Sequence, residues 1–454
     1  MKPTLHRSLT AVEYFAFGFG SMVGVGWLVI MDDWLGRGGP AGAALGFLIG
    51  GLLLLPIAAT YGRLVRDLPD AGAEIAYTEG VFPRFLSFAT GWIMVLAYAI
   101  VCPWEAVAIG NLLARVLPWL NTIPMYAVAG HPIYLPRVSA GLLLTGIIAT
   151  INYRGIRLSG LFQDVTTFGL LAIFAVFVAL GFLRGTPANL APAFARPGGA
   201  GALVSTLLVL QIVPYFMTGF ESVAKGSEEA KAGFDPADFG RAMKAAVLAG
   251  ATFYVLIVLV VAYVYPWREV VAGSVGTEIA FQRAFGSRAI ADLILLAAFL
   301  SLFKVYNGNF VAATRLLFAI GRRGLVHPSL SALHPRFGTP AGAILLLSAI
   351  TAAASLLGDS VLVPISEVGS MAVGVGWSSA CIAYLLRGER AGRHAALAVM
   401  GGLVGAGIVL MKALPGIPGS FTGVEWLAFV TWCALGFAFW LARLSFQNRA
   451  APSD

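Results

Sequence analysis

Apolar residues along this chain gather into long runs that short polar segments separate. A helix needs about 20 predominantly apolar residues to cross a bilayer. Runs of suitable length occur at 14–35, 41–62, 85–114, 138–153, 160–183, 203–223, 243–265, 288–319, 340–357, 361–386, 395–413 and 423–445. The run at 138–153 is the shortest and could begin near Pro132. The pattern therefore predicts an all-α polytopic membrane protein with twelve transmembrane helices.

Composition and charge agree with this interpretation. Hydrophobic residues make up 59% of the chain and charged residues only 11%, whereas soluble domains carry roughly 25% charged residues. With the N-terminus inside, twenty Lys and Arg residues fall on the cytoplasmic side and nine on the other. Cytoplasmic loops carry an excess of Lys and Arg, so we expect both termini in the cytoplasm and the chain in the plasma (inner) membrane. The net charge of +8 then needs no nucleic-acid partner.

Two of the apolar runs are interrupted. The first contains "GSMVGVGWLV" (20–29), with three glycines within seven residues, and the sixth contains Pro214 followed by Gly219. Gly and Pro both weaken a helix interior. These runs are the first helices of two halves of five spans, and an odd number of spans gives the halves opposite orientations. Interrupted helices at corresponding positions indicate a binding site near the middle of the bilayer. A small-residue packing face is the alternative reading of the glycines.

Several segments carry recognisable motifs. They are "GSMVGVGWLV", "LPDAGAEIAY" (68–77), "ATGWIMVLAY" (89–98), "MTGFESVAKGSEEAK", "VYNGNFVAATRLLFAIGRRG" and "SEVGSMAV". In this order, over residues 10–390, they resemble the amino acid–polyamine–organocation (APC) superfamily. The resemblance implies a LeuT-type 5+5 inverted repeat with discontinuous helices 1 and 6. It implies a transporter core over 1–390, with repeats at roughly 10–183 and 203–386, and two peripheral helices with a C-terminal tail over 391–454.

The resemblance also implies alternating-access transport of a small molecule, an amino acid or a closely related amine. Backbone amides of Val25 and Gly26 are expected to hold its carboxylate, and carbonyls of Met22, Tyr215 and Thr218 to face its amino group. The full set of residues expected at the substrate site from the two breaks is Met22, Gly24, Val25, Gly26, Tyr215, Phe216, Thr218, Gly219 and Phe220. Coupling or gating roles are expected for Trp27, Glu105, Glu221, Asn309 and Thr314.

The chain departs from the family pattern in two places. Trp27 stands where a smaller aliphatic residue is usual, and its side chain would narrow the pocket or plug its outer mouth. Leu170 stands at the position best matching a helix-five lysine that replaces sodium in many members. Thr314, with the carbonyl of Val23, could then form a sodium site, and exchange without an ion is equally open.

Two ionisable residues fall near the middle of predicted spans. Glu105 lies in the third span and Lys304 in the eighth. A charge at mid-bilayer costs at least about 2.5 kcal/mol, which makes such residues candidates for function. We expect them either to pair with each other, as a proton-sensitive switch or as a structural pair, or to contact the substrate. Lys304 is therefore added to the substrate-site residues.

The remaining observations narrow the function class. No nucleotide-binding loop, metalloprotease motif or hydrolase nucleophile motif is present, so an enzyme is not expected. The five histidines fall in loops or tails and the three cysteines are widely separated, so neither a metal site nor a disulfide is expected. No cofactor is expected beyond H⁺ or Na⁺ as a coupling ion. The sequence favours proton-coupled symport or exchange. Sodium coupling and a non-transporting sensor or channel are the alternatives, in a monomer or homodimer.

Overall fold

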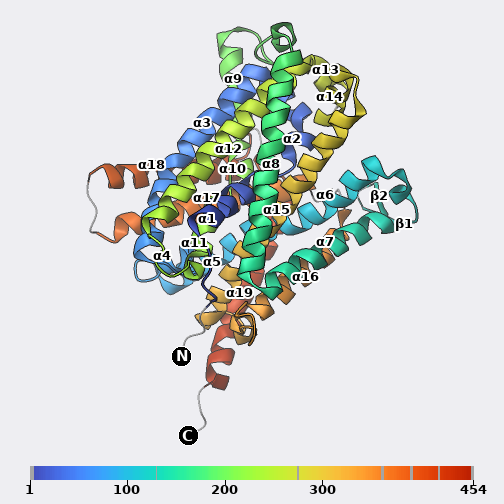
Figure 1. The fold of residues 1–454 in the computed structure, drawn as a ribbon. Coiled ribbons are helices and arrows are strands. Elements are labelled where there is room, and N and C mark those ends of the chain that lie inside the picture. The colour runs from blue at the N-terminus through green and yellow to red at the C-terminus, as the bar shows by residue number, and fades with distance from the viewer. Residues whose placement is uncertain are drawn as a thin grey trace.

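Helices dominate the computed structural model, which describes residues 5–128, 130–273, 276–358, 362–388, 392–417 and 420–450. Eleven helical runs in these residues are long and apolar enough to cross a membrane. A further apolar helix, α16 (Ala341–Ser355), has 15 residues and stands where the ninth span is expected. The polytopic helical architecture predicted from the apolar runs is thus present (Figure 1).

The first five spans comprise α1 (Ala11–Met22) with α2 (Gly26–Val29), α3 (Met31–Asp67), α5 (Arg84–Ala99) with α6 (Val101–Val116), α7 (Leu135–Arg154) and α8 (Ile156–Arg184). The run α3 contains the end of one span and the whole of the next, because the chain turns at Gly39, where φ is +64°. Only glycine fits this turn, since a Cβ there would lie 2.7 Å from the backbone nitrogen of Ala195. The fourth span, α7, has 20 residues and is longer than its apolar run indicated.

The later spans comprise α9 (Gly198–Leu210) with α10 (Val213–Phe216), α12 (Ala237–Val264), α15 (Arg288–Arg322), α16, α17 (Leu362–Leu386), α18 (Arg393–Ala413) and α19 (Gly423–Ala450). Only 22% and 11% of the residues in the most apolar windows of α18 and α19 are buried, against 72% in the span Ala11–Val29. These two helices therefore lie at the periphery, and the span that contains the first interruption lies inside, whereas the span Gly198–Phe216 is 33% buried.

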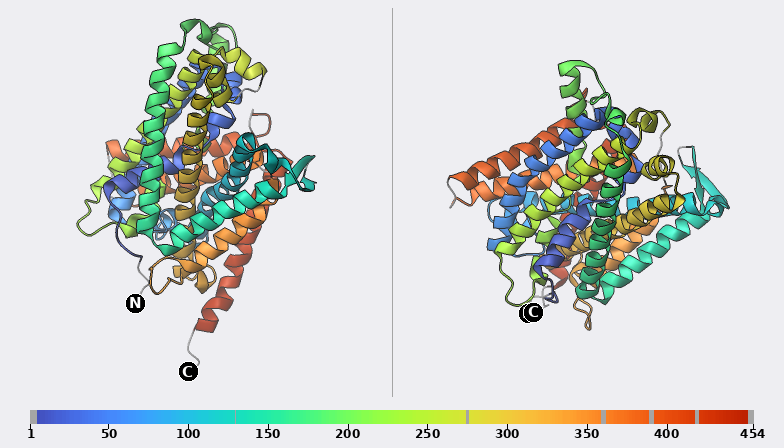
Figure 2. Two further views of the ribbon diagram at one scale, coloured as in Figure 1. Left: turned by 45° about the vertical axis from the view of Figure 1, so that its right-hand side comes forward. Right: turned by 45° about the horizontal axis from the view of Figure 1, so that its top comes forward.

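Short elements connect the spans. They are α4 (Glu74–Thr78), α11 (Ser222–Lys225), α13 (Trp267–Ala272), α14 (Thr277–Phe285), the 3-10 turns η1 (Pro118–Asn121), η2 (Pro187–Leu190), η3 (Ser227–Glu229) and η4 (Pro328–Ser331), and the strands β1 (Pro124–Val128) and β2 (His131–Tyr134). The two strands form an antiparallel hairpin in which Ala127 pairs with Pro132. The hairpin projects from the helical body, on the side opposite α18 in the right-hand view of Figure 2. The sequence did not predict it, because such short and mostly exposed strands leave no alternating apolar pattern.

One end of the molecule collects the beginnings of α1, α12 and α18 and the ends of α3 and α15. We call this end the N-terminal face. The chain before α1 is tied to it, because the amides of Ser8 and Leu9 donate to the carbonyl of Glu229 at 2.8 and 2.9 Å. Many of the basic residues that the sequence placed on one side of the membrane lie here.

Candidate functional site

The two interrupted spans meet at their breaks. Helix α1 ends at Met22, and Val23 is extended with φ −91° and ψ 92°. In the other span, Gly219 has φ +114°. A Cβ at Gly219 would lie 2.7 Å from the carbonyl carbon of Ser21, so the two backbones are in direct contact. Each interruption leaves backbone groups that no helix satisfies.

A small cavity of about 40 Å³ lies between the breaks. It is lined from the two breaks by Ser21, Met22, Gly24, Val25, Gly26, Tyr215, Phe216 and Thr218, from α6 by Val101, Trp104 and Glu105, and from α15 by Val305. Within the described chain, the amides of Val25 and Gly26 donate no hydrogen bond to a backbone carbonyl. The cavity therefore has backbone donors on one side and the second break on the other. Seven of the expected substrate-site residues line it.

The other three expected substrate-site residues lie elsewhere. Gly219 packs behind the cavity against Ser21. Phe220 is buried against the ring of Trp377, with centroids 5.7 Å apart. Lys304 is fully buried and contacts helix α1 instead of the cavity. Substrate contact by these three residues would need a different arrangement of the helices.

The ammonium group of Lys304 lies at the freed carbonyls of the first break. It donates to the carbonyl of Gly20 at 3.3 Å and also to that of Val23. The hydroxyl of Ser301, one turn earlier on α15, reaches the carbonyls of Val23 at 2.9 Å and Gly24 at 2.8 Å. Helix α15 thus supplies the donors that the interrupted helix lacks.

Glu105 approaches the same break from α6. One of its carboxylate oxygens, Oε1, would lie 3.5 Å from a Cβ on Gly24. The other, Oε2, is buried and has no hydrogen-bond partner among the described residues. Glu105 and Lys304 interact electrostatically, but the ion pairs of the described chain do not include one between them. The carboxylate is therefore available to another group that enters the cavity.

The remaining expected coupling residues are spread over several contacts. Trp27 does not line the cavity but packs among aromatic rings, with centroids 6.4 Å from Phe177 and 6.2 Å from Phe253. Asn309 donates to the carbonyl of Ser21 at 3.2 Å. Thr314 donates to carbonyls of its own helix, so Val23 meets Lys304 and Ser301 rather than Thr314.

The carboxylate of Glu221 caps the second break. It accepts the hydroxyl of Thr218 at 3.0 Å and the amide of Gly219 at 3.1 Å. A carboxylate that accepts these donors fixes the irregular backbone that follows α10. Glu221, for which a coupling or gating role was expected, is thus part of the second break.

Among the site residues that sequence reasoning missed are two side chains that contact backbone carbonyls of the interrupted spans and of α15. The hydroxyl of Tyr254, on α12, lies 3.2 Å from the carbonyl of Met22 and 3.1 Å from that of Phe216, so it joins the two breaks. Gln163, on α8, donates to the carbonyls of Ala16 at 3.2 Å and Lys304 at 3.1 Å. Both stand in apolar runs, where nothing in the spacing distinguishes them from packing residues.

A buried polar cluster lies between the cavity and the N-terminal face. The ammonium of Lys225 is 2.5 Å from Oε1 of Glu74, and both side chains are fully buried. The hydroxyl of Tyr61 donates to the same carboxylate at 2.8 Å. The ammonium also lies over the ring of Tyr98, 4.8 Å from its centroid. The segment after α3 is thus attached to the end of the second interrupted span.

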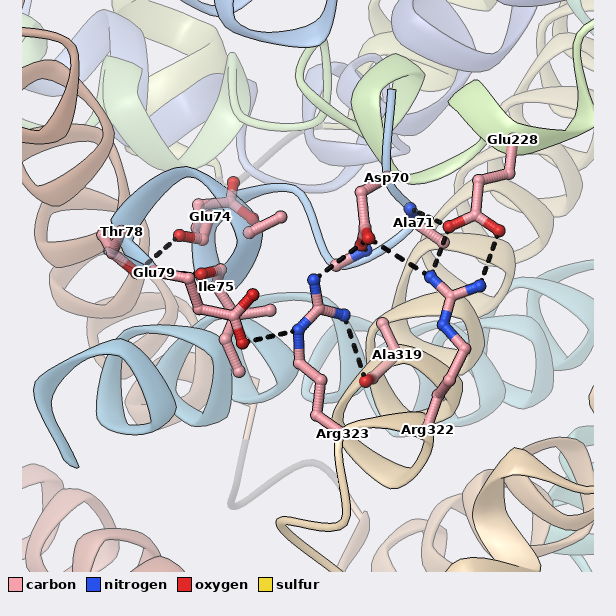
Figure 3. A network of polar contacts seen from close by, with 12 residues as sticks. Asp70, Ala71, Glu74, Ile75, Thr78, Glu79, Glu228, Ala319, Arg322 and Arg323 are labelled. Atoms are coloured by element: carbon pink, nitrogen blue, oxygen red, sulfur yellow. Dashed lines mark hydrogen bonds and ion pairs between the residues drawn. The ribbon is translucent and has the colours of Figure 1, made fainter. Parts of the chain in front are cut away.

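Charged residues close the N-terminal face (Figure 3). Arg322 binds Glu228 at 2.5 Å and Asp70 at 3.3 Å, and Arg323 binds Asp70 at 3.0 Å and Glu79 at 2.8 Å. Burial acts to raise the pKa of Asp70, but the guanidinium of Arg323 outweighs it, together with hydrogen bonds from Arg323 and from the amide of Gly72 and the charge of Arg322, and the pKa falls below its usual range. Asp70 therefore stays ionised, and the network joins three segments that are distant in the sequence.

A second ion pair lies deeper beside this network. Arg315 contacts both carboxylate oxygens of Glu229, at 2.9 and 3.1 Å, and both side chains are buried. Burial raises the pKa of Glu229, and Arg315 opposes that change. Such bidentate pairs fix geometry as well as charge. The pair therefore holds the C-terminal half of α15 against the turn η3.

Comparisons with known proteins agree with this architecture. The chain is 27% identical to the methylthioribose transporter of Bacillus subtilis (strain 168), over 95% of this chain and 92% of that protein. It is 26% identical to the branched-chain amino acid permease BcaP of the same organism, over 84% and 79% of the two chains. It is 24% identical to the lysine-specific permease LysP of Escherichia coli (strain K12), over 75% and 69%. The model of the family described as amino acid permease matches residues 14–411. The chain therefore belongs to the amino acid permease family, whose members are transporters and not enzymes.

Proposed function

We propose that this protein is a secondary active transporter that moves an amino acid or a closely related amine across the plasma membrane by alternating access. We further propose that its first ten spans form a LeuT-type 5+5 inverted repeat, with the N-terminal face in the cytoplasm. The observation that carries the proposal is the cavity between two interrupted spans, which freed backbone groups line. Matched interrupted helices are typical of transporter substrate sites.

The lining suits a small zwitterion. The amides of Val25 and Gly26 would hold a carboxylate, because backbone donors without partners favour an anion. The carbonyls of Tyr215 and Thr218, with Glu105 opposite them, would receive an ammonium group. Tyr215 and Phe216 add aromatic surface, and their ring centroids are 5.1 Å apart. A cargo of this class would satisfy both sides of the cavity at once.

The cavity is too small for such a cargo in the present arrangement. A cavity needs roughly 10–15 Å³ of accessible volume to hold one water molecule, so about 40 Å³ admits only a few waters. Substrate entry therefore requires helix movement. The ion pairs of Figure 3 hold the N-terminal face closed, and their separation would open the cavity toward that face. This state corresponds to a closed intermediate of an alternating-access cycle.

Proton coupling is the mode that the contacts favour. The ammonium of Lys304 already occupies the freed carbonyls of the first break, where a sodium ion would otherwise bind. Glu105 is the carboxylate at the cavity, and the titratable groups that interact with it are Lys304, Tyr215, Cys102, Tyr254 and Tyr306. Protonation of Glu105 would remove the charge opposite Lys304. Sodium coupling is the less favoured alternative.

A binding and uptake screen tests the proposal. The purified protein is examined by thermal shift against the twenty amino acids, common polyamines and methylthioribose at pH 5.5 and 7.5, with and without sodium. Ligand binding to the native state raises the melting temperature. Hits are then tested for uptake into proteoliposomes, which distinguishes transport from sensing. We expect an amino acid or amine to bind and to accumulate without sodium. Binding of none of them, or binding without uptake, would contradict the proposal.

A further inference from the structure

A second, larger cavity lies at the N-terminal face, away from the proposed substrate site. Its volume is about 360 Å³, and five basic side chains from three spans line it: Arg63 and Arg66 of α3, Lys244 of α12, and Arg393 and His394 of α18. Its floor is formed where α3 and α12 cross at glycines, since a Cβ at Gly62 would lie 2.5 Å from the Cα of Gly240. Small residues at the crossing leave room beneath the basic side chains.

The charges around this cavity are unbalanced. No carboxylate stands among its lining residues in the described part of the chain. Among the nearby acidic residues, Asp235 and Asp238 both bind Arg241 outside the cavity, and Asp67 is 3.3 Å from Arg66, one of the lining cations. Arg63, Lys244 and Arg393 have no carboxylate partner among the described residues, and with His394 they face one cavity of a size typical of ligand sites. A cavity lined by charges of one sign attracts an ion of the opposite sign, here an anion.

Two of the arginines converge on a neutral acceptor. Nη2 of Arg63 lies 2.6 Å from Nε2 of His394, and Nε of Arg393 lies 3.4 Å from the same nitrogen. A guanidinium can only donate, so the imidazole nitrogen must accept. An anionic oxygen accepts such donors more strongly, through charge-assisted hydrogen bonds. In addition, Gly392 immediately precedes α18 and has no side chain to cap its first amides. The guanidinium groups of Arg63 and Arg393 thus point toward one position, where the ring nitrogen of His394 accepts their hydrogen bonds.

We propose that this basic pocket binds the phosphate of an anionic phospholipid head group. Three membrane-spanning helices end or begin at the pocket, at Asp67, Ala237 and Arg393, which places it at the level of lipid head groups. Basic pockets between transmembrane helices are a recognised form of head-group site, and anionic lipids are enriched in the cytoplasmic leaflet. Arginine is suited to phosphate because its donors form a planar fork. The lipid would join the peripheral helix α18 to α3 and α12. This inference rests on the proposed cytoplasmic position of the N-terminal face, but it does not depend on the transported cargo.

Lipid binding to matched variants tests the inference. The full-length protein is purified in detergent, stripped of lipid and titrated with dioleoylphosphatidylglycerol or dioleoylphosphatidylcholine, and bound lipid is counted by native mass spectrometry. The pocket variant is Arg63→Gln with Lys244→Gln. The matched control, Lys231→Gln with Arg241→Gln, removes two positive charges from the same face outside the pocket. The charge-preserving variant Arg63→Lys with Lys244→Arg keeps both positive charges, so it shows whether a loss of lipid binding comes from the lost charge or from a disturbed fold.

The outcomes distinguish the sources of phosphate. We expect phosphatidylglycerol to bind in preference to phosphatidylcholine, and its affinity to fall roughly tenfold or more in the pocket variant but not in the control or the charge-preserving variant. Glycerol 3-phosphate and inorganic phosphate at millimolar concentration should not compete. Competition by either would assign the pocket to a soluble anion and overturn the lipid assignment. Equal binding by the pocket variant, or equal loss in pocket variant and control, would overturn the site itself.

Discussion

The ammonium group of Lys304 lies 3.3 Å from the carbonyl oxygen of Gly20, although 284 positions separate the two residues in the sequence. The contact brings a cation from the middle of α15 to the break in the first span. Because Lys304 is fully buried, the freed carbonyls of this break face its amine nitrogen and not solvent. The stability of the break and the position of α15 are therefore linked.

Replacement of this lysine should impair transport without creating a requirement for sodium. In Lys304→Met, the carbonyls of Gly20 and Val23 lose their cationic donor, and an unsatisfied buried polar group costs about 1–3 kcal/mol. We expect uptake into proteoliposomes to fall at least about tenfold. Lys231→Met, at an exposed loop position, is the control and should transport normally. Normal, sodium-independent uptake by Lys304→Met would contradict the role we propose for the lysine.

The pH dependence of uptake should reside in Glu105. In Glu105→Gln the side chain keeps its shape but cannot change its charge, so uptake should become nearly constant between pH 5.5 and 7.5. The initial rate at saturating substrate, measured across this range in both proteins, checks the prediction. Glu269→Gln alters an exposed carboxylate that contacts only Tyr265 among the described hydrogen bonds, and should keep the native profile. A native profile in Glu105→Gln would exclude this residue as the proton site.

The interruptions of the two spans were predictable from the sequence, but the side chains that contact their freed backbone groups were not. Three glycines in one span and Pro214 with Gly219 in another are local features, and the structure places both breaks side by side. Tyr254 and Ser301 bridge the freed carbonyls, yet each stands in an apolar run where only the packing of α12 and α15 decides which way it points. Trp27 was expected to narrow the pocket or to plug its outer mouth, but its ring packs against aromatic rings of α8 and α12.

The conformation of Gly219 should make it intolerant of any side chain. Its φ of +114° strains other residues by about 1–3 kcal/mol, and a Cβ would also lie 2.7 Å from the carbonyl carbon of Ser21. We expect Gly219→Ala to lower the thermal midpoint and to abolish substrate binding. The matched variant is Gly407→Ala, because a Cβ at Gly407 meets nothing within 4 Å. That change should be neutral or should stabilise α18 by up to about 1 kcal/mol. Equal midpoints for the two variants would contradict the contact between the breaks.

The network at the N-terminal face should act independently of pH. The pKa of Asp70 lies below its ordinary value of 3.8, so its contribution to stability is fully present above that value and is lost only as pH falls through the lower folded value. Asp70→Asn should therefore change the uptake rate by the same factor at pH 5.5 and at pH 7.5. Asp235→Asn, in an exposed pair with Arg241, should have little effect at either pH. An effect of Asp70→Asn at one pH only would show that Asp70 titrates in the working range.

The buried pair of Glu74 and Lys225 should show strong coupling in a double-mutant cycle. Removing either partner leaves the other charge buried without its counter-ion, which typically costs 3–5 kcal/mol. Glu74→Gln and Lys225→Met should each lower the thermal midpoint sharply, and the double variant should recover much of the loss because no uncompensated charge remains. The exposed pair of Asp238 and Arg241 provides the reference cycle, with an expected coupling of about 0–1 kcal/mol. Additive losses at Glu74 and Lys225 would mean that each side chain stabilises the fold through its other contacts, with Tyr61 and Tyr98, rather than through the ion pair.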